Sequence, residues 1–249
     1  MIYTHRMSRA KKKGALGLVL GLFAGVLLTL AVTGAPFVRY AKADVQSVHS
    51  AEVKTDLTSV TENSRNWQLL LINEEHPLAT DYVPPSLTAI DTSHSVDSRI
   101  AADLQEMLAD GAAQGLNMYV TSSYRSYERQ TELFNEGMQT RMDSGLTPLE
   151  SYQATKSSVA LPGASEHQAG LAVDIIAAAY PELDERQGDT PEQQWLMAHC
   201  QEYGFILRYP KGTESITGIT YEPWHYRYVG KEAAQEITEQ GITLEEYLQ

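Results

Sequence analysis

The sequence predicts an α+β domain in which helices flank a central antiparallel sheet. Two observations carry this prediction. Segments with apolar residues at helical spacing, such as 95–113, alternate with short β-branched runs such as 118–124. In addition, none of the expected strands leads into a Gly-rich phosphate loop, which disfavours a doubly wound nucleotide fold. The chain has 249 residues, 43% of them hydrophobic, which is enough to bury a core.

The first expected elements alternate between strands and helices. Short apolar or β-branched runs predict strands, whereas apolar residues at intervals of three and four predict helices. In chain order these elements are a strand at 67–72 (WQLLLI), a helix over 95–113 that stops before Gly115, a strand at 118–124 and a helix over 127–142.

Two later helices begin with a capping pattern, in which Thr precedes a Pro at the first helical position and a Glu or Gln follows three residues later. The pattern occurs at Thr147-Pro148-Leu149-Glu150 and at Thr190-Pro191-Glu192-Gln193, and Gly204 ends the second of these helices. The remaining expected elements are strands at 170–176, 205–209 and 223–229 and a last helix at 231–240.

The charge distribution before this domain predicts a membrane segment. Residues 1–43 carry seven basic side chains and no acidic one, and the stretch 14–36 is uncharged and long enough to cross a hydrocarbon core of ~30 Å. The basic flank 1–13 is expected in the cytoplasm by the positive-inside rule. The polar stretch 37–65 is interpreted as a stalk, so the domain 66–249 is expected outside the cytoplasm on a single-pass anchor in the cell membrane.

A cleaved signal peptide is the alternative interpretation of the same stretch. Ala41-Lys42-Ala43 fits the small-x-small cleavage pattern, and cleavage near Ala43 would release a secreted protein. The apolar stretch is longer than the ~7–15 residues of a signal core, which favours the uncleaved anchor. The domain is exported in both interpretations.

Composition excludes several kinds of partner and site. The net charge is −13, with 12 basic against 32 acidic residues beyond residue 43, so no nucleic acid partner is expected. The single cysteine, Cys200, leaves no intrachain disulfide and no multi-cysteine metal site. We interpret Cys200 as a packed small hydrophobe. A metal ion would therefore be held by histidine and carboxylate.

Two short segments contain such residues. His167 lies in the loop before the strand at 170–176, and Asp174 lies along that strand in an otherwise apolar run. An unpaired buried carboxylate costs several kcal/mol, so Asp174 needs either an arginine in a buried salt bridge or a metal ion. In the second segment, Glu222 and His225 flank Pro-Trp, and a Pro-bent start of the strand can turn Glu222 toward a site that His225 also lines.

His167, Asp174 and His225 together make three ligands, with Glu222 as an additional carboxylate. Three protein ligands and one open position are typical of catalytic zinc, which lowers the pKa of water in the open position toward ~7 while a carboxylate takes its proton. Other hydrolytic schemes lack their residues. The Ser-x-x-Lys pattern occurs only at Ser8–Lys11, on the cytoplasmic flank, and no His-Glu-x-x-His is present.

On these residues the chain resembles the VanY-type D-alanyl-D-alanine carboxypeptidases, which are zinc metallopeptidases grouped with the D-Ala-D-Ala dipeptidases and the Hedgehog-like fold. The resemblance runs from about residue 67 to the C-terminus, and the segment GFILRYPKG is also typical of the family. The family patterns Ser-x-His-x-x-Gly-x-Ala-x-Asp and Glu-x-x-His are matched by Ser165, His167, Gly170, Ala172 and Asp174 and by Glu222 and His225.

The resemblance implies one Zn²⁺ ion held by His167, Asp174 and His225, with Glu222 as the general base. It also implies that Arg125, after the strand at 118–124, grips the substrate's terminal carboxylate or polarises the scissile carbonyl, as a guanidinium can through two parallel hydrogen bonds. A salt bridge to a structural carboxylate is the alternative for Arg125. Further implied substrate contacts are Gln130, Ser165 and Tyr209.

The function expected from the resemblance is removal of the terminal D-alanine from peptidoglycan stem peptides or their precursors. Two alternatives stay open: an L,D-carboxypeptidase that acts on tetrapeptide stems, and a zinc-stabilised module that binds the cell wall without cutting it. Glu222 beside a complete ligand set argues against the module, because a binder has no chemical need for a base.

Overall fold

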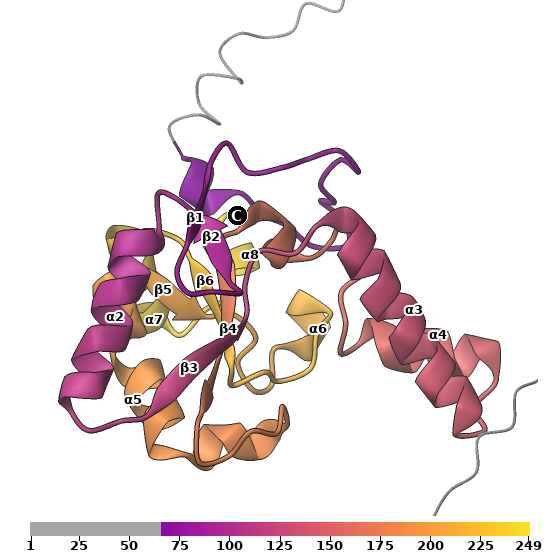
Figure 1. The fold of residues 1–249 in the computed structure, drawn as a ribbon. Coiled ribbons are helices and arrows are strands. Elements are labelled where there is room, and N and C mark those ends of the chain that lie inside the picture. Colours follow the sequence, from indigo (N-terminus) through magenta and orange to yellow (C-terminus); the bar gives the residue numbers. More distant parts are fainter. Residues whose placement is uncertain (1–65) are drawn as a thin grey trace, which may run out of the picture. The chain divides into compact units, whose positions relative to one another are not determined.

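The computed structural model describes residues 66–249, which form an α+β fold around an antiparallel sheet (Figure 1). Within this range the main sheet has four strands in the order β3-β4-β6-β5, and all three pairings are antiparallel. Its strands are β3 (Met118–Ser122), β4 (Ala172–Ala177), β5 (Phe205–Leu207) and β6 (His225–Tyr228). A separate hairpin pairs β1 (Leu87–Ala89) with β2 (Ser95–Asp97).

Helices of two kinds surround the sheet. The longer helices are α2 (Ala101–Ala113), α3 (Tyr127–Asp143), α4 (Pro148–Lys156), α5 (Pro191–His199) and α7 (Lys231–Gln240), and the single-turn helices are α6 (Glu214–Thr217) and α8 (Leu244–Tyr247). Short 3-10 turns lie at η1 (Trp67–Leu69), η2 (Glu166–Ala169), η3 (Glu185–Asp189) and η4 (Cys200–Tyr203). Helices α2, α5 and α7 contact strands of the sheet, whereas α3 and α4 pack on each other and project away from it (Figure 1).

Strand β4 lies at the centre of the domain. All six of its residues are buried, which matches the nearly continuous apolar run AVDIIA. Its neighbours in the core include Leu104 and Met107 from α2 and Phe205 from β5, each with no exposed surface. Asp174 is the charged residue in this strand, so the rigid core of the fold also carries a carboxylate.

Most of the expected elements are confirmed with small shifts at their ends. The predicted stops at Gly115 and Gly204 both have positive φ, 83° and 86°, where a side chain would be strained. The capping box at Thr147 is complete. At Thr190 only half of it forms, because the side chain of Gln193 points into the core and bonds the Ile175 carbonyl and the Tyr226 hydroxyl.

The predicted strand at 67–72 is wrong. Residues Trp67–Leu69 form the 3-10 turn η1, and the chain then continues without regular structure. The carbonyls of Gln68 and Leu70 accept hydrogen bonds from the buried Arg227 guanidinium, at 3.0 and 2.7 Å. Because a side chain satisfies these carbonyls, the segment joins no sheet although its apolar residues still pack on the core.

The predicted start of the helix at residue 95 is also wrong. Ser95–Asp97 form strand β2 of the hairpin, and α2 begins at Ala101. Val96 and Ile100 are fully buried, as the helical interpretation required, but Val96 is buried from a strand. Three residues are too few to show a strand period, so the helical spacing that follows obscured the hairpin.

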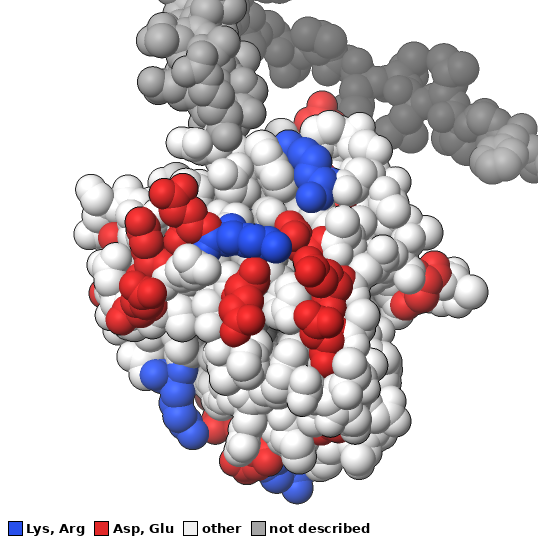
Figure 2. All heavy atoms as spheres, turned by 90° about the vertical axis from the view of Figure 1, so that its left-hand side faces the viewer, with Lys and Arg blue, Asp and Glu red and all other residues white. Residues whose placement is uncertain are grey.

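The surface charge of the described domain can be compared with the acidic composition of the sequence, whereas the predicted N-terminal segments cannot be examined. The face that carries α2 has more acidic than basic side chains (Figure 2). Asp103 of α2, for example, lies 3.2 Å from Lys231. Within residues 66–249, the helices are all too short or too polar to span a membrane. The predicted segments 1–13, 14–36 and 37–65 lie outside the described residues.

Candidate metal centre and active site

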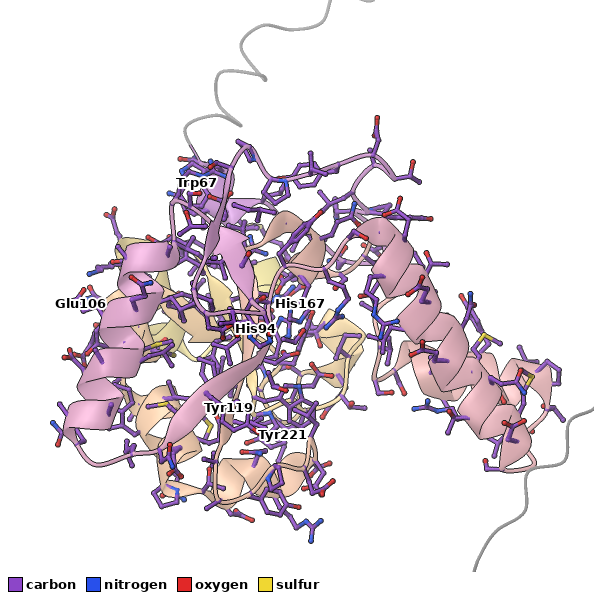
Figure 3. The ribbon with its side chains drawn as sticks, in the orientation of Figure 1. Trp67, His94, Glu106, Tyr119, His167 and Tyr221 are labelled. Carbon is purple, nitrogen blue, oxygen red and sulfur yellow. The ribbon has the colours of Figure 1, made fainter. Side chains whose placement is uncertain are left out.

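A tight turn places His167 ahead of β4. The single turn η2 (Glu166–Ala169) ends at Gly170, which has a φ of 66°. A Cβ at this position would lie 2.8 Å from the backbone nitrogen of Asp97, so both the left-handed conformation and the close contact require glycine. The turn buries His167 in the interior, whereas Glu106 on α2 points away from the domain (Figure 3).

Strand pairing brings the next two residues together. In the register of β4 with β6, Asp174 lies opposite His225, although 51 residues separate them in the chain. Cross-strand neighbours have Cβ atoms about 4.5–5.5 Å apart, so their side chains meet on one face of the sheet. The rigid centre of the sheet thus sets the geometry of this pair.

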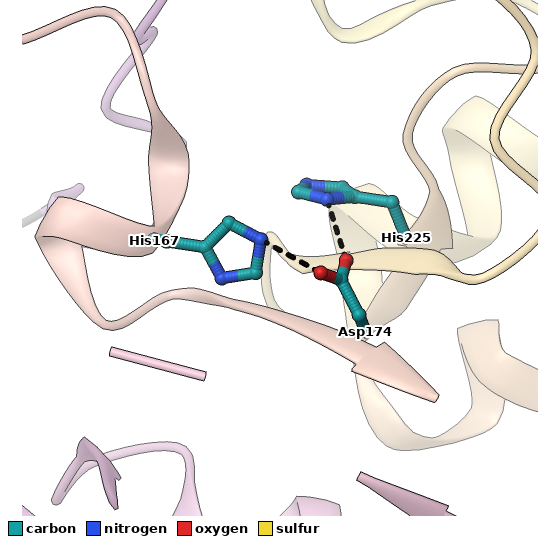
Figure 4. Close-up of side chains that lie close together, drawn as sticks. All are labelled: His167, Asp174 and His225. Carbon is teal, nitrogen blue, oxygen red and sulfur yellow. Dashed lines mark hydrogen bonds and ion pairs between the residues drawn. The ribbon is translucent and has the colours of Figure 1, made fainter. Parts of the chain in front are cut away.

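The three side chains converge on one point (Figure 4). Nε2 of His167 lies 3.3 Å from one carboxylate oxygen of Asp174, and Nδ1 of His225 lies 3.1 Å from the other. One possible ligand atom from each residue lies within 4.8 Å of the others, and all three residues are buried. Arg125 comes no closer to Asp174 than 4.0 Å. Imidazoles, not an arginine, are therefore the close partners of this carboxylate.

The two rings offer opposite nitrogens to the cluster. Nδ1 of His167 lies 2.8 Å from the Ser123 carbonyl, which can only accept, so this nitrogen carries the hydrogen and Nε2 has its lone pair toward Asp174. Burial lowers the pKa of His167, which favours the neutral ring that a metal needs. For His225, burial lowers the pKa, but hydrogen bonds to Asp174 and Glu166 outweigh it and raise the pKa to about 9.

This donor set fits zinc. Burial by itself raises the pKa of Asp174, but the charges and hydrogen bonds of His167 and His225 hold it well below its usual range, so the carboxylate is ionised. Two imidazole nitrogens and one carboxylate oxygen are ligands that zinc accepts in catalytic sites, where three protein ligands leave one position open. The three ligand atoms already lie within 4.8 Å of one another, as the ligands of one ion must.

Glu222 lies beside the cluster at the start of β6. The N–H of His225 donates to the Glu222 carbonyl at 3.2 Å, which closes a turn around Pro223 and directs the carboxylate toward the site. Oε2 of Glu222 lies 3.9 Å from Nδ1 of His225. Burial raises the pKa of Glu222 to about 8. A carboxyl group with a pKa near neutrality is suited to accepting and then returning a proton.

Arg125 enters the site from the end of β3. Its backbone N–H donates to the His167 carbonyl at 3.1 Å, and its guanidinium donates to Gln130 Oε1 at 2.7 Å and Ser122 Oγ at 2.6 Å. Burial lowers the pKa of Arg125, but a guanidinium stays protonated at neutral pH. Among residues 66–249, Asp174 is the nearest carboxylate, at 4.0 Å, so Arg125 makes one long ion pair, and its partner belongs to the ligand cluster.

A pocket of about 350 Å³ opens onto these groups. Ser165 and Tyr209, the other two predicted substrate contacts, line the pocket, and the Tyr209 ring centre lies 4.9 Å from that of His225. Gln130 does not line it: the side chain is buried and its amide bonds Arg125 and the Ala160 carbonyl. In the structure Gln130 therefore supports Arg125 from behind, and its predicted substrate contact stays a prediction.

The sequence alone did not reveal the apolar wall of the pocket or the role of Glu166. The wall is formed by Leu133, Val159, Ala160, Leu183, Ile219 and Trp224. Trp224 adjoins the Glu-x-x-His pattern and Glu166 adjoins His167, so proximity to a motif was the available signal for these two. The other wall residues come from the α3–α4 pair and from loops whose positions the sequence does not specify.

The remaining histidines of residues 66–249 lie near the surface. His76, His94 and His199 bond Asn73, Asp91 and Glu202, respectively, which agrees with a structural interpretation. Cys200 is buried, and burial raises the pKa of its thiol to about 12, so it is no nucleophile at neutral pH. Among the described residues, the candidate catalytic groups are therefore His167, Asp174, His225 and the adjacent Glu222.

The fold and site define a class of protein. A buried His-Asp-His cluster, an adjacent glutamate and an arginine that lines the same pocket form the site of a zinc hydrolase whose substrate carries a negative charge. Comparison with known proteins gives the family. Residues 93–231 match the family model described as VanY, D-alanyl-D-alanine carboxypeptidase.

Similar proteins are found among both sequences and solved structures. The chain is 38% identical over 206 residues to the putative carboxypeptidase YodJ of Bacillus subtilis, a match that covers 79% of this chain and 72% of the relative. It is 38% identical over 186 residues to a D-alanyl-D-alanine carboxypeptidase of Enterococcus faecalis, covering 75% and 67%. A zinc complex of a mutant of the vancomycin-resistance D,D-pentapeptidase VanY superposes with a TM-score of 0.67 at 39% identity, covering 74% and 99%.

A second kind of relative has nearly the same similarity. The structure of the LD-carboxypeptidase LdcB superposes with a TM-score of 0.63 at 36% identity, covering 72% of this chain and 84% of that one. On the family match and the curated relatives together, the chain belongs to the VanY family of D-alanyl-D-alanine carboxypeptidases.

Proposed function

We propose that this protein is a zinc-dependent carboxypeptidase that removes the terminal D-alanine from peptidoglycan stem peptides or their precursors. The observation that carries the proposal is the His167, Asp174 and His225 cluster with Glu222 beside it, all in one pocket. Relatives of this chain include a D-alanyl-D-alanine carboxypeptidase and a VanY structure in complex with D-alanine-D-alanine, which supports the same substrate here.

The chain's own residues divide the work. His167, Asp174 and His225 would hold the ion, which would supply Lewis acidity toward a water molecule and the scissile carbonyl. Glu222 accepts the proton of the attacking water and returns it to the departing amine, a role suited to a carboxyl group whose pKa burial raises to about 8. Burial of the ligands keeps bulk water away and strengthens these charge interactions.

Arg125 makes the site a carboxypeptidase. Its guanidinium is held by Gln130 and Ser122 and lines the pocket close to the ligand cluster. A substrate carboxylate bound there would leave the preceding peptide bond next to His167, Asp174 and His225, which line the same pocket, so cleavage would remove the last residue of the peptide. The apolar wall suits the methyl group of alanine, because Val159, Ala160 and Ile219 offer no charged group to it.

An L,D-carboxypeptidase is the second candidate. Relatives of this kind, such as LdcB, align with this chain almost as well as VanY does. The ligand cluster and Glu222 set the hydrolytic chemistry, whereas the configuration of the residue before the scissile bond is read by the pocket wall. The two candidates therefore differ in substrate and not in mechanism.

A two-substrate assay tests the proposal. Full-length protein is incubated with a pentapeptide stem ending in D-Ala-D-Ala and with a tetrapeptide stem ending in a single D-Ala, and the products are weighed. We expect the pentapeptide to lose one alanine and the tetrapeptide to remain. Cleavage of the tetrapeptide alone would support the L,D-carboxypeptidase, and cleavage of neither would contradict both candidates.

We further propose that the domain acts outside the cytoplasm, tethered by the uncharged stretch 14–36. The basic flank before it and the polar stretch after it support this orientation. Protease treatment of intact cells tests the proposal, because the domain is then accessible while a cytoplasmic control protein is not. Protection of the domain in intact cells would contradict it.

A further inference from the structure

Glu166 is a buried carboxylate that the reaction described above does not use. Its side chain has 0% exposure, and it precedes the ligand His167 in the chain. Its Oε2 nevertheless lies 3.2 Å from Nε2 of the other histidine, His225. This nitrogen is on the opposite side of the ring from Nδ1, which faces Asp174.

Two guanidinium groups occupy the other oxygen of Glu166. Oε1 accepts from Arg208 Nε and from Arg227 Nη1, both at 2.7 Å. Arg208 also makes two hydrogen bonds to Glu245 of α8, at 2.9 and 2.6 Å. The two arginines and two glutamates cancel in formal charge, which makes a buried network of this size tolerable.

We propose that Glu166 is a positioning residue that fixes the orientation and tautomer of His225 for metal binding. The two arginine donors fix Oε1, so the carboxylate cannot rotate and Oε2 stays aimed at His225. A carboxylate oxygen only accepts, and His225 faces one on each side, Asp174 at Nδ1 and Glu166 at Nε2. When a metal ion takes the place of the hydrogen on Nδ1, the remaining hydrogen stays on Nε2, where Glu166 accepts it. Metal-binding histidines in general donate their second nitrogen to such a partner.

The network extends this support to the ends of the domain. Arg208 follows β5 and ties Glu166 to α8, and Arg227 ties it to the carbonyls of Gln68 and Leu70 near η1. The network thus connects Glu166 to segments far from the pocket, while within it Glu166 alone bonds the ring of His225. This inference rests on the proposed function, because it assigns Glu166 to the same zinc site.

Glu166→Gln tests the tautomer argument directly. Glutamine keeps the shape but has one acceptor oxygen, and the two arginine donors would take it. The amide NH₂ would then face Nε2 of His225, and two donors cannot bond each other. His225 would shift its hydrogen to Nδ1, where the metal must bind. We expect the zinc affinity to fall about 10–100-fold.

Glu245→Gln is the matched control. It removes the same charge from the same network, on the far side of Arg208, and Glu245 makes no contact with His225 in the structure. We expect both variants to lower Tm by similar amounts, whereas Glu245→Gln should keep zinc affinity within about threefold of the wild type. Zinc affinity is measured on full-length protein by competition with a chelator, and the absorption spectrum of the cobalt-substituted protein reports ligand geometry.

The outcomes separate the two proposals. An equal loss of zinc affinity in both variants, or no loss in either, would overturn the positioning role. A wild-type protein that binds no zinc would instead contradict the proposed function. If Glu166→Gln does not fold, ¹⁵N spectra of the histidine rings in the zinc-loaded wild type provide the test. Two rings should respond to zinc: His167 should carry its hydrogen on Nδ1 and His225 on Nε2. The same tautomer in both rings would overturn the inference.

Discussion

His167 and His225 are the same type of ligand but are held in different ways. A main-chain carbonyl, that of Ser123, orients His167, whereas a side-chain carboxylate, that of Glu166, orients His225. Burial lowers the pKa of His167, while for His225 hydrogen bonds outweigh burial and raise the pKa to about 9. The His167 half of the site is therefore oriented by a backbone carbonyl, which a side-chain substitution does not remove. The His225 half is oriented by a charged side-chain network, which mutation and pH can change.

The largest effects should be the same for both histidines. His167→Ala and His225→Ala each remove a direct ligand, so we expect zinc affinity to fall well beyond the roughly 10–100-fold typical of an outer partner, and activity to disappear. Metal analysis after dialysis and D-alanine release check this. Full zinc occupancy in either variant would show that the residue is not a ligand.

Glu222 contacts the His225 half of the site, and its replacement should separate binding from chemistry. Glu222→Gln keeps the shape but cannot accept a proton, so we expect kcat to fall about 10²–10⁴-fold. Zinc affinity should stay within about threefold of the wild type, since Glu222 is not one of the three ligands. A variant with more than a tenth of wild-type kcat would remove Glu222 from the mechanism.

Arg125 contacts the His167 half through the backbone, and its guanidinium should control the choice of substrate. For Arg125→Met we expect kcat/KM to fall on the order of 10²-fold, because a charged hydrogen-bonding partner of the terminal carboxylate is lost. The wild type should discriminate strongly against a peptide with an amidated C-terminus, and the variant should not. Equal discrimination in both proteins would contradict the carboxylate-binding role.

The pH dependence of zinc binding should report on His225. A proton on His225 competes with the metal, and the pKa of His225 is raised to about 9. As the pH increases toward this value, zinc affinity should therefore increase by about one log unit per pH unit, and above it the affinity should become constant. Glu222→Gln is the background for this measurement, because it removes the carboxyl group whose pKa lies at about 8. An affinity that stays constant between pH 7 and 9 would mean that His225 is already neutral.

The smallest effect is expected at Ser123. Ser123→Ala removes the hydroxyl that accepts from the Ser95 N–H but leaves the carbonyl that orients His167. Stability should fall by about 1 kcal/mol, and zinc affinity should stay within about threefold of the wild type. The contrast with Glu166→Gln tests the difference between the two halves. A large loss of zinc affinity in Ser123→Ala would remove that difference.

The two motifs could be found in the sequence because their residues lie close together in the chain, and the structure brings His167, Asp174 and His225 into one cluster. His167 and Asp174 lie on either side of Gly170, whose conformation is specific to glycine, and Glu222 and His225 are joined by a local turn. Such short-range features are visible in a sequence.

Long-range pairings were not visible. Glu166 stands next to His167 but acts on His225, through a contact across 59 residues. The segment 67–72 resembles a strand, yet its carbonyls are satisfied by Arg227 from the far end of the chain. Local sequence patterns cannot identify Glu166 as the partner of His225 or Arg227 as the partner of segment 67–72. The chain contains several arginines and carboxylates with the same chemistry, and only the fold determines which of them makes the contact.

The most direct test of the account is zinc titration of the metal-free, full-length protein with a pentapeptide stem as substrate. Activity should be absent after chelation, return in proportion to added zinc and reach its maximum at one ion per chain, with a product lighter by one alanine. Full activity in the chelated protein, or one bound zinc without release of alanine, would contradict the assignment of His167, Asp174, His225 and Glu222 as a zinc carboxypeptidase centre.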